Sequence, residues 1–276
     1  MQGIYFITGT DTGVGKTVLT TLLARDLREH GVNAAALKPI CSGGREDARR
    51  IFTAMDGSRV RSPHQKNAVA ARTGSRWQRH LPTSSPHHRL GVLTLNEINP
   101  WHFRAAVAPL LAARRENRKV RLPQVLAHVR AMRKRFEILL IEGAGGLLSP
   151  LGCSGGLRPT QNSPALTERH YRKEFNSRDL IVALRAIPII VAPNRLGAVN
   201  HILLTLEALP LAIRRRAKLV LMSPRNPDIA TGTNVSLLGE YFDARQIFEL
   251  PWLGGNVSID RILKNPHVRR TLRGLL

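Results

Sequence analysis

The sequence is poor in cysteine, in long apolar runs and in acidic residues, and each deficit excludes a class of protein. Its two cysteines, Cys41 and Cys153, are too few for a disulfide framework, and neither stands in a CxxC pattern. We expect both to be reduced and structural. No apolar run approaches the about 20 residues that a membrane-spanning helix needs, and the strand-like run 3–8 leaves no room for a signal peptide before it. The sequence therefore predicts a cytoplasmic protein.

The shortage of acidic residues gives the chain a strong positive charge. Its 42 Lys and Arg residues outnumber its 19 Asp and Glu residues, for a net charge of +23. A basic surface gathers nucleic-acid phosphates by counterion release, so a P-loop ATPase that binds nucleic acid is an alternative function. The segment 58–91 holds seven basic residues and no acid, but Trp77 is its only aromatic residue and it has no helical period. This composition favours non-specific binding of polyanions, if any.

Length and periodicity indicate one large α/β domain over residues 1–276. A chain of 276 residues with 43% hydrophobic content can bury a substantial core without disulfides. Short runs that are apolar on both faces alternate with segments of helical period, which predicts a doubly wound, mostly parallel sheet. The predicted strands are 3–8, 32–37, 137–142, 187–192, 217–222 and 246–250, and the clearest predicted helices are 16–29, 122–135 and 198–209.

Two segments interrupt this alternation. The basic segment 58–91 is rich in Ser, Pro, His and Gln, and 152–175 opens with clustered Gly, Ser, Pro and Asn. Neither shows a period of strand or helix, and both carry turn-forming residues in clusters. We expect two inserted loops, irregular or disordered, on a P-loop fold that tolerates them.

The strongest motif is the segment Gly9–Thr17, which lies between the first predicted strand and an amphipathic helix. A loop of this type turns backbone N–H groups toward phosphates at a helix N-terminus, its Lys reaches the β- and γ-phosphates, and its Thr hydroxyl is placed for Mg²⁺. Thr10 stands where the usual pattern has its first Gly, with Gly9 one residue early. A glycine turn that only joins strand to helix is the weaker reading. The predicted nucleotide-binding residues are Gly13, Val14, Gly15, Lys16, Thr17 and Val18.

Two more strand ends carry polar groups that can reach the same edge of the sheet. Lys38 follows the second predicted strand, and Glu142 ends the third, before a run of glycines that includes Gly145. Taken alone, Lys38 is better explained by a solvated lysine at a strand end, and an ordinary turn would explain the glycines. Together with Asp47 and Thr17, however, Glu142 gives an oxygen set that suits one Mg²⁺ on a nucleoside triphosphate. Gly145 allows close backbone approach to a substrate.

The segment 196–201 offers a possible seat for a carboxylate. Gly197, Ala198 and Asn200 open an apolar helix, and the amides of a helix N-terminus attract anions. A plain helix start with a solvated Asn200 fits the same residues equally well. Both interpretations stay open.

Taken in order, these motifs resemble those of dethiobiotin synthetases. The resemblance covers nearly the whole chain apart from the two inserts, and it is more specific than a P-loop alone. Asp11 stands where the related partition and septum-site ATPases carry a signature Lys. The matching segments are Gly9–Thr17, Lys38–Gly43, Asn99–Phe103, Glu142–Gly146, Leu196–His201 and Pro251–Leu253.

The resemblance implies a reaction that consumes ATP and requires Mg²⁺. In it, 7,8-diaminononanoate takes up CO2 as a carbamate, the γ-phosphate activates the carbamate as a carbamic-phosphoric anhydride, and the second amine closes the ureido ring of dethiobiotin. By similarity, Lys38 holds the carbamate and Lys16 the migrating phosphoryl group, while Thr12 and Ser42 donate hydrogen bonds to substrate. Thr17, Asp47 and Glu142 would hold the Mg²⁺, and Gly145 would approach the substrate.

The resemblance also implies a homodimer with a shared active site. In the family, the helix that corresponds to the one beginning near Gly197 seats the substrate carboxylate from the partner subunit. One departure concerns the base, because the family commonly reads adenine with an Asn where this chain has Ser223. We therefore expect relaxed base selectivity. Cobyrinate-type amidation, another reaction of related ATP-binding domains, needs a glutaminase domain with a Cys nucleophile, for which this chain is too short.

Overall fold

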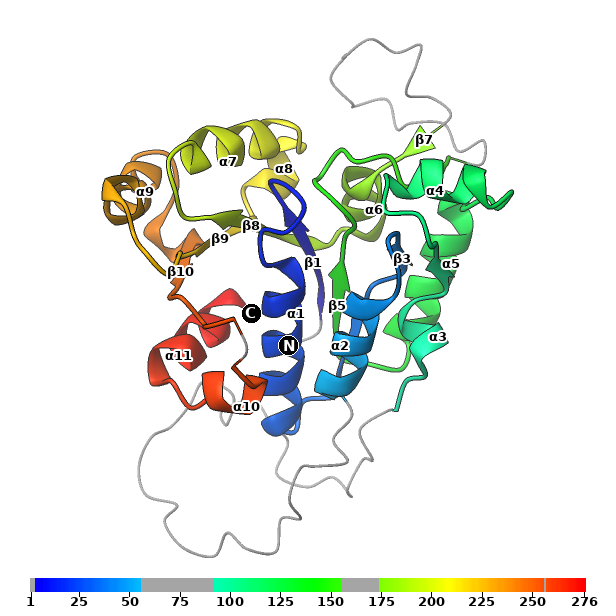
Figure 1. Cartoon of the computed structure of the whole chain (residues 1–276), viewed down its shortest axis with the longest axis horizontal. Helices are drawn as coiled ribbons and strands as arrows, with labels where there is room; N and C mark the ends of the chain where they lie inside the picture. The colour runs from blue at the N-terminus through cyan, green and yellow to red at the C-terminus, as the bar shows by residue number, and fades with distance from the viewer. Residues whose placement is uncertain (1–2, 56–91, 155–173, 256) are drawn as a thin grey trace, which may run out of the picture.

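A six-stranded parallel sheet forms the centre of the molecule (Figure 1). The structure is a computed structural model that describes residues 3–55, 92–154, 174–255 and 257–276. Every neighbouring pair of strands in this sheet is parallel. In spatial order the strands are β10 (Ile247–Leu250), β9 (Lys218–Met222), β8 (Ile187–Pro193), β1 (Gly3–Gly9), β5 (Ile138–Glu142) and β2 (Ala34–Leu37). All six predicted strands, and the predicted fold class, are confirmed.

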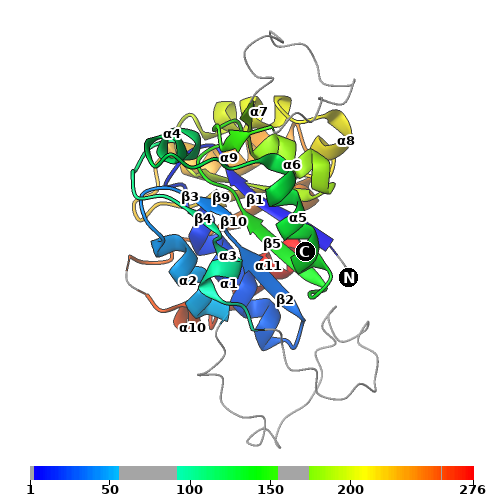
Figure 2. The ribbon, with the colours of Figure 1, turned by 90° about the vertical axis from the view of Figure 1, so that its right-hand side faces the viewer.

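Helices cover both faces of the sheet because its strands are apolar on both sides. All residues of β2 and β5 are buried, as expected for interior parallel strands. Helix α1 (Lys16–Glu29) packs against α2 (Glu46–Met55) and α11 (Pro266–Leu275) on one face, whereas α5 (Leu122–Arg133) and α6 (Ser177–Leu184) cover the other (Figure 2). The remaining helices are α3 (Leu95–Ile98), α4 (Pro109–Arg115), α7 (Ala198–Glu207), α8 (Leu211–Arg214), α9 (Ile229–Gly239), the 3₁₀ helix η5 (Ala244–Gln246) and α10 (Ile259–Ile262).

The strand order places a ligand-binding edge at the carboxyl end of β1. Strands β5 and β2 lie on one side of β1, and β8, β9 and β10 lie on the other. The order therefore reverses at β1, and ligands of open α/β sheets bind outside the carboxyl ends of the strands at such a point. The three predicted helices start at the predicted residues and end at Glu29, Arg133 and Glu207, the last two slightly earlier than predicted.

Two small sheets lie beside the main one. Strand β3 (Ile40–Cys41) pairs in parallel with β4 (Trp101–His102), and β6 (Gly152–Cys153) pairs antiparallel with β7 (Glu174–Phe175). The second pair differs from the expectation that 152–175 is irregular, because both ends of that segment are strands. The rest of it, 155–173, and the whole of 58–91 lie outside the described residues.

Both cysteines are free thiols, as expected, with Cys41 buried and Cys153 half-buried. Within the described ranges, every helix is too short or too polar to cross a bilayer.

Candidate active site

The loop from Gly9 to Thr17 joins β1 to α1 at the carboxyl edge of the sheet, as predicted. Gly13 and Gly15 have φ angles of 75° and 100°, and Gly15 caps the helix. Both angles lie in the left-handed region that favours glycine. A Cβ on Gly9 would stand 2.6 Å from Cγ2 of Val14, so a glycine is needed one residue before the usual position. This packing favours glycine at position 9.

Lys16 lies inside this loop rather than in solvent. Its side chain is buried, and its Nζ donates to the backbone oxygen of Asp11 at 2.6 Å. Burial lowers the pKa of Lys16 to about 8, although the charge of Glu142 opposes the shift. An ammonium folded back on its own loop is in position to serve phosphates bound there.

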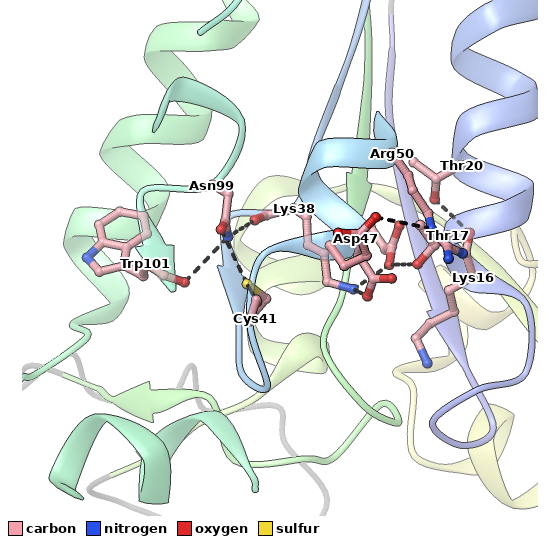
Figure 3. Close-up of polar contacts among 12 residues, drawn as sticks. Lys16, Thr17, Thr20, Lys38, Cys41, Asp47, Arg50, Asn99 and Trp101 are labelled. Carbon is pink, nitrogen blue, oxygen red and sulfur yellow. Dashed lines mark hydrogen bonds and ion pairs between the residues drawn. The ribbon is translucent and has the colours of Figure 1, made fainter. Parts of the chain in front are cut away.

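A charged cluster lies beside the loop and joins the ends of β1, β2 and β5 (Figure 3). Nζ of Lys38 is 2.5 Å from Oδ2 of Asp47 and 2.6 Å from Oε1 of Glu142. The same Oε1 accepts a hydrogen bond of 2.7 Å from Oγ1 of Thr17. Four residues that sequence analysis placed at one edge of the sheet are therefore in direct contact.

Electrostatics keep this cluster charged in spite of its burial. Burial lowers the pKa of Lys38, but the charges of Glu142 and Asp47 outweigh it, and the net pKa is raised. Burial likewise raises the pKa of Asp47, but the Lys38 ammonium outweighs it and holds that pKa below its ordinary value. Lys38 is therefore an ammonium group at neutral pH, paired with at least one ionised carboxylate.

The oxygen atoms of this cluster fit a magnesium ion. Oε2 of Glu142 is buried and has no hydrogen-bond partner, so one carboxylate oxygen is left without a donor. Thr17, Asp47 and Glu142 offer a hydroxyl and two carboxylates, which are hard ligands that Mg²⁺ accepts. Among the described residues, no group of three or more His, Cys, Asp or Glu side chains could hold a metal ion. A site built on these three residues would take its remaining oxygen ligands from water or from a bound nucleotide.

Asn99 fixes the backbone of Lys38, a role that sequence analysis did not assign. Asn99 is fully buried and its Nδ2 donates to the Lys38 oxygen at 2.7 Å. Its Oδ1 accepts from Nε of Arg45 at 3.2 Å and from Sγ of Cys41 at 3.3 Å. The Lys38 N–H also donates to the oxygen of Ile98 at 3.0 Å. The position of Asn99 in the motif Asn99–Phe103 was the only sequence signal for this contact.

A second polar cluster lies at the ends of β8, β9 and β10, and it consists mainly of amides and hydroxyls. Asn194 is buried, and its Nδ2 donates to the Thr231 oxygen and to Oε1 of Glu249, both at 3.1 Å. Its Oδ1 accepts from Nδ2 of Asn234 at 2.9 Å, and Ser223 donates to the same Glu249 oxygen at 2.5 Å. Sequence analysis named only Ser223 here. These bonds tie α9 to the sheet.

Comparison with known proteins identifies the family to which this site belongs. A family profile described as an AAA domain matches residues 4–154. The ATP-dependent dethiobiotin synthetase BioD of Akkermansia muciniphila is 31% identical over 264 residues, which span 95% of this chain and 99% of that protein. The chain belongs to the dethiobiotin synthetase family.

Two further dethiobiotin synthetases show the same relationship. The protein of this name from Thermodesulfovibrio yellowstonii is 30% identical over 256 residues, or 92% of this chain and 90% of that protein. The one from Anaeromyxobacter sp. strain Fw109-5 is 34% identical over 213 residues, or 76% of this chain and 71% of that protein. The resemblance inferred from motifs is thereby confirmed.

The other predicted site residues lie on different parts of the chain. A Cβ on Gly145 would stand 3.9 Å from Oγ1 of Thr12, so the loop after β5 approaches the phosphate loop as expected. Ser42 follows β3 and is half-buried. Gly197, with a φ of 86°, caps α7, whose first residue Ala198 is buried while Asn200 is exposed. The substrate-binding roles of these residues stay predictions.

Proposed function

We propose that this chain is an ATP- and Mg²⁺-dependent dethiobiotin synthetase that closes the ureido ring of dethiobiotin on 7,8-diaminononanoate and CO2. The observation that carries the proposal is the contact of Thr17, Lys38, Asp47 and Glu142 beside the phosphate loop in a member of this family. Phosphoryl transfer needs positioned charges rather than a protein nucleophile, and these residues supply them.

The side chains divide the reaction between them. One amine of the substrate adds to CO2 and loses a proton, and Lys38 would hold the resulting carbamate by charge. A carbamate oxygen then attacks the γ-phosphorus and ADP leaves, while Lys16 would neutralise the charge on the moving phosphoryl group. The second amine attacks the carbamate carbon, loses a proton and expels phosphate. Thr12 and Ser42 would orient substrate and intermediate through hydroxyl hydrogen bonds.

Thr17, Asp47 and Glu142 are the residues that would hold Mg²⁺ with the nucleotide. The ion would supply charge neutralisation at the phosphates. The partnerless Oε2 of Glu142 supports this assignment, because a buried carboxylate oxygen without a donor is costly unless a ligand completes it.

We also propose a homodimer in which α7 contributes to the partner's site. Leu196, in the turn before this helix, is 83% exposed and Leu204, on the helix, is 62% exposed, so both offer apolar surface to a partner subunit. The Gly197 amide and the Asn200 side chain would seat the substrate carboxylate, next to Ala198, whose own N–H donates to the Arg195 oxygen. Light scattering that finds only monomers at assay concentrations would remove this part of the proposal.

The test is dethiobiotin formation by the purified chain. Product detected by mass spectrometry should require diaminononanoate, bicarbonate, Mg²⁺ and ATP together, and omission of any one should abolish it. Because the chain is strongly basic, a parallel assay is run with added DNA. Phosphate release that DNA stimulates without any dethiobiotin would favour the nucleic-acid-dependent ATPase instead.

A further inference from the structure

Lys38 lies where a cation held by Asp47 and Glu142 would lie. Its Nζ is 2.5 Å from one of these carboxylates and 2.6 Å from the other, and the Glu142 oxygen that it contacts also accepts from Thr17. Figure 3 shows the Lys38 side chain directed into the group formed by Asp47 and Thr17. The lysine assigned to substrate is thus engaged by the three residues assigned to the metal.

Burial makes this pairing necessary in the protein without metal. The Glu142 side chain has an exposed fraction of 0% and that of Lys38 has 6%. A buried carboxylate without a counter-ion is strongly unfavourable, and one Glu142 oxygen already lacks a partner. Lys38 therefore serves as the internal counter-ion of Asp47 and Glu142.

The same geometry disfavours simultaneous binding of a metal ion and the Lys38 ammonium by Asp47 and Glu142. A divalent ion bound to Glu142 and Asp47 would compete with the ammonium for the same oxygen atoms and would repel it. The Lys38 backbone is held in place by two hydrogen bonds, from its N–H to the Ile98 oxygen and from Nδ2 of Asn99 to its oxygen. Its four-carbon side chain is flexible, so the ammonium group is the part that can leave.

We propose that Lys38 occupies the magnesium position in the metal-free protein and that the metal displaces its ammonium toward the substrate. This inference rests on the metal assignment of the proposed function. Metal loading then precedes the binding of the carbamate by Lys38, because Lys38 is held by the carboxylates until the metal replaces it. Lys38 thus stabilises the two carboxylates in the metal-free protein and becomes available for substrate once the metal is bound.

The test measures binding of Mn²⁺ alone, by the electron paramagnetic resonance signal of the free ion. Lys38→Met removes the competing ammonium and should tighten Mn²⁺ binding by about fivefold or more, the lower end of typical coupling between linked sites. Lys218→Met is the matched control, because it removes one lysine charge at the start of β9, away from the carboxyl edge of the sheet. It should bind Mn²⁺ as the wild type does. Unchanged affinity in Lys38→Met would overturn the exchange.

A second measurement uses the wild-type protein and does not depend on the folding of a variant. Reductive methylation of Lys38, followed by mass spectrometry, should become faster when Mn²⁺ is added, with Lys218 as internal reference. A rate for Lys38 that Mn²⁺ leaves unchanged or lowers would also overturn the exchange. If Mn²⁺ binds neither the wild type nor Lys38→Met, even with ATP, the metal assignment itself is overturned. If the wild type forms dethiobiotin and the two proteins bind Mn²⁺ with the same affinity, the exchange alone is overturned.

Discussion

The two polar clusters at the carboxyl edge of the sheet differ in how completely they satisfy their own groups. The cluster at β1, β2 and β5 pairs full charges and leaves Oε2 of Glu142 without a partner. The cluster at β8, β9 and β10 uses both polar atoms of the Asn194 amide within the protein. We infer that the first cluster is completed by ligands and performs chemistry, while the second holds the fold.

This difference has a physical basis. A buried charge with an unsatisfied oxygen is costly, so it persists where a bound ligand repays the cost. A satisfied amide network rigidifies its surroundings without needing a ligand. Substitutions in the first cluster should therefore reduce activity, whereas substitutions in the second should reduce stability and spare activity.

A large effect on turnover is expected for Lys16→Ala. Loss of the ammonium removes charge stabilisation of the phosphoryl group and should lower kcat/KM by about 10²–10³-fold, as for loss of one preorganised donor. Stability should change little, because the side chain makes one hydrogen bond to its own loop. Lys134→Ala, on the exposed end of α5, is the control for charge. Turnover near the wild-type level in Lys16→Ala would contradict the phosphate-loop assignment.

Lys38→Ala should affect both activity and stability. Glu142 would be left buried without a counter-ion, which should reduce the free energy of unfolding by about 3–5 kcal/mol in a metal-free buffer. Dethiobiotin formation should be lost while ATP still binds, because Lys38 is assigned to the carbamate. Urea unfolding and ATP titration check the two effects. An equal loss of ATP binding would reassign Lys38 to the phosphates.

In the second cluster, Asn234→Leu should reduce stability and spare the chemistry. It removes the donor to Oδ1 of Asn194 and to the Arg195 oxygen, and an unsatisfied buried acceptor costs about 1–3 kcal/mol. Urea unfolding measures the loss, and kcat should stay close to that of the wild type. A large fall in kcat with unchanged stability would remove the distinction between the clusters.

The pH dependence should come from the phosphate loop, beside the first cluster. Lys16, with its pKa lowered to about 8, is charged below that pH and neutral above it. The kcat/KM for ATP, which reports the free enzyme, should therefore fall by about tenfold per pH unit above about pH 8. At saturating ATP the fall in kcat should begin at higher pH, since phosphate charge favours the ammonium form. A flat kcat/KM profile up to pH 10 would show that the charge on Lys16 is not required.

The smallest effect is expected for Ser223→Asn, in the second cluster. Met222 lies against Gly15, so the end of β9 is beside the phosphate loop. An added amide that bonds adenine should raise the preference for ATP over GTP by about 2- to 12-fold, the value of one net hydrogen bond. Competition assays with both nucleotides measure it. An unchanged preference for ATP over GTP would show that the nucleotide base does not bind next to residue 223.

How much of this follows from sequence differs between the two clusters. The residues of the charged cluster follow short apolar strands at recognisable motifs, and parallel strands bring such ends to one edge, so Lys16, Lys38 and Glu142 could be placed without a structure. Their mutual pairing could not, because it depends on how a buried carboxylate finds a counter-ion in three dimensions. Asn194, Asn234 and Glu249 belong to no charge pattern or periodic run, and their contacts span 40 and 55 residues of sequence. The two-residue strands β3, β4, β6 and β7 are too short to leave a period-two signal.

The most direct test of the central claim compares dethiobiotin and phosphate formed in the same reaction by wild type, Lys38→Ala and Asn234→Leu. The account predicts one phosphate per dethiobiotin for wild type and Asn234→Leu at a temperature where both are folded, and no dethiobiotin for Lys38→Ala. Dethiobiotin formation that survives in Lys38→Ala but is lost in folded Asn234→Leu would contradict it, because the chemistry would then lie in the second cluster.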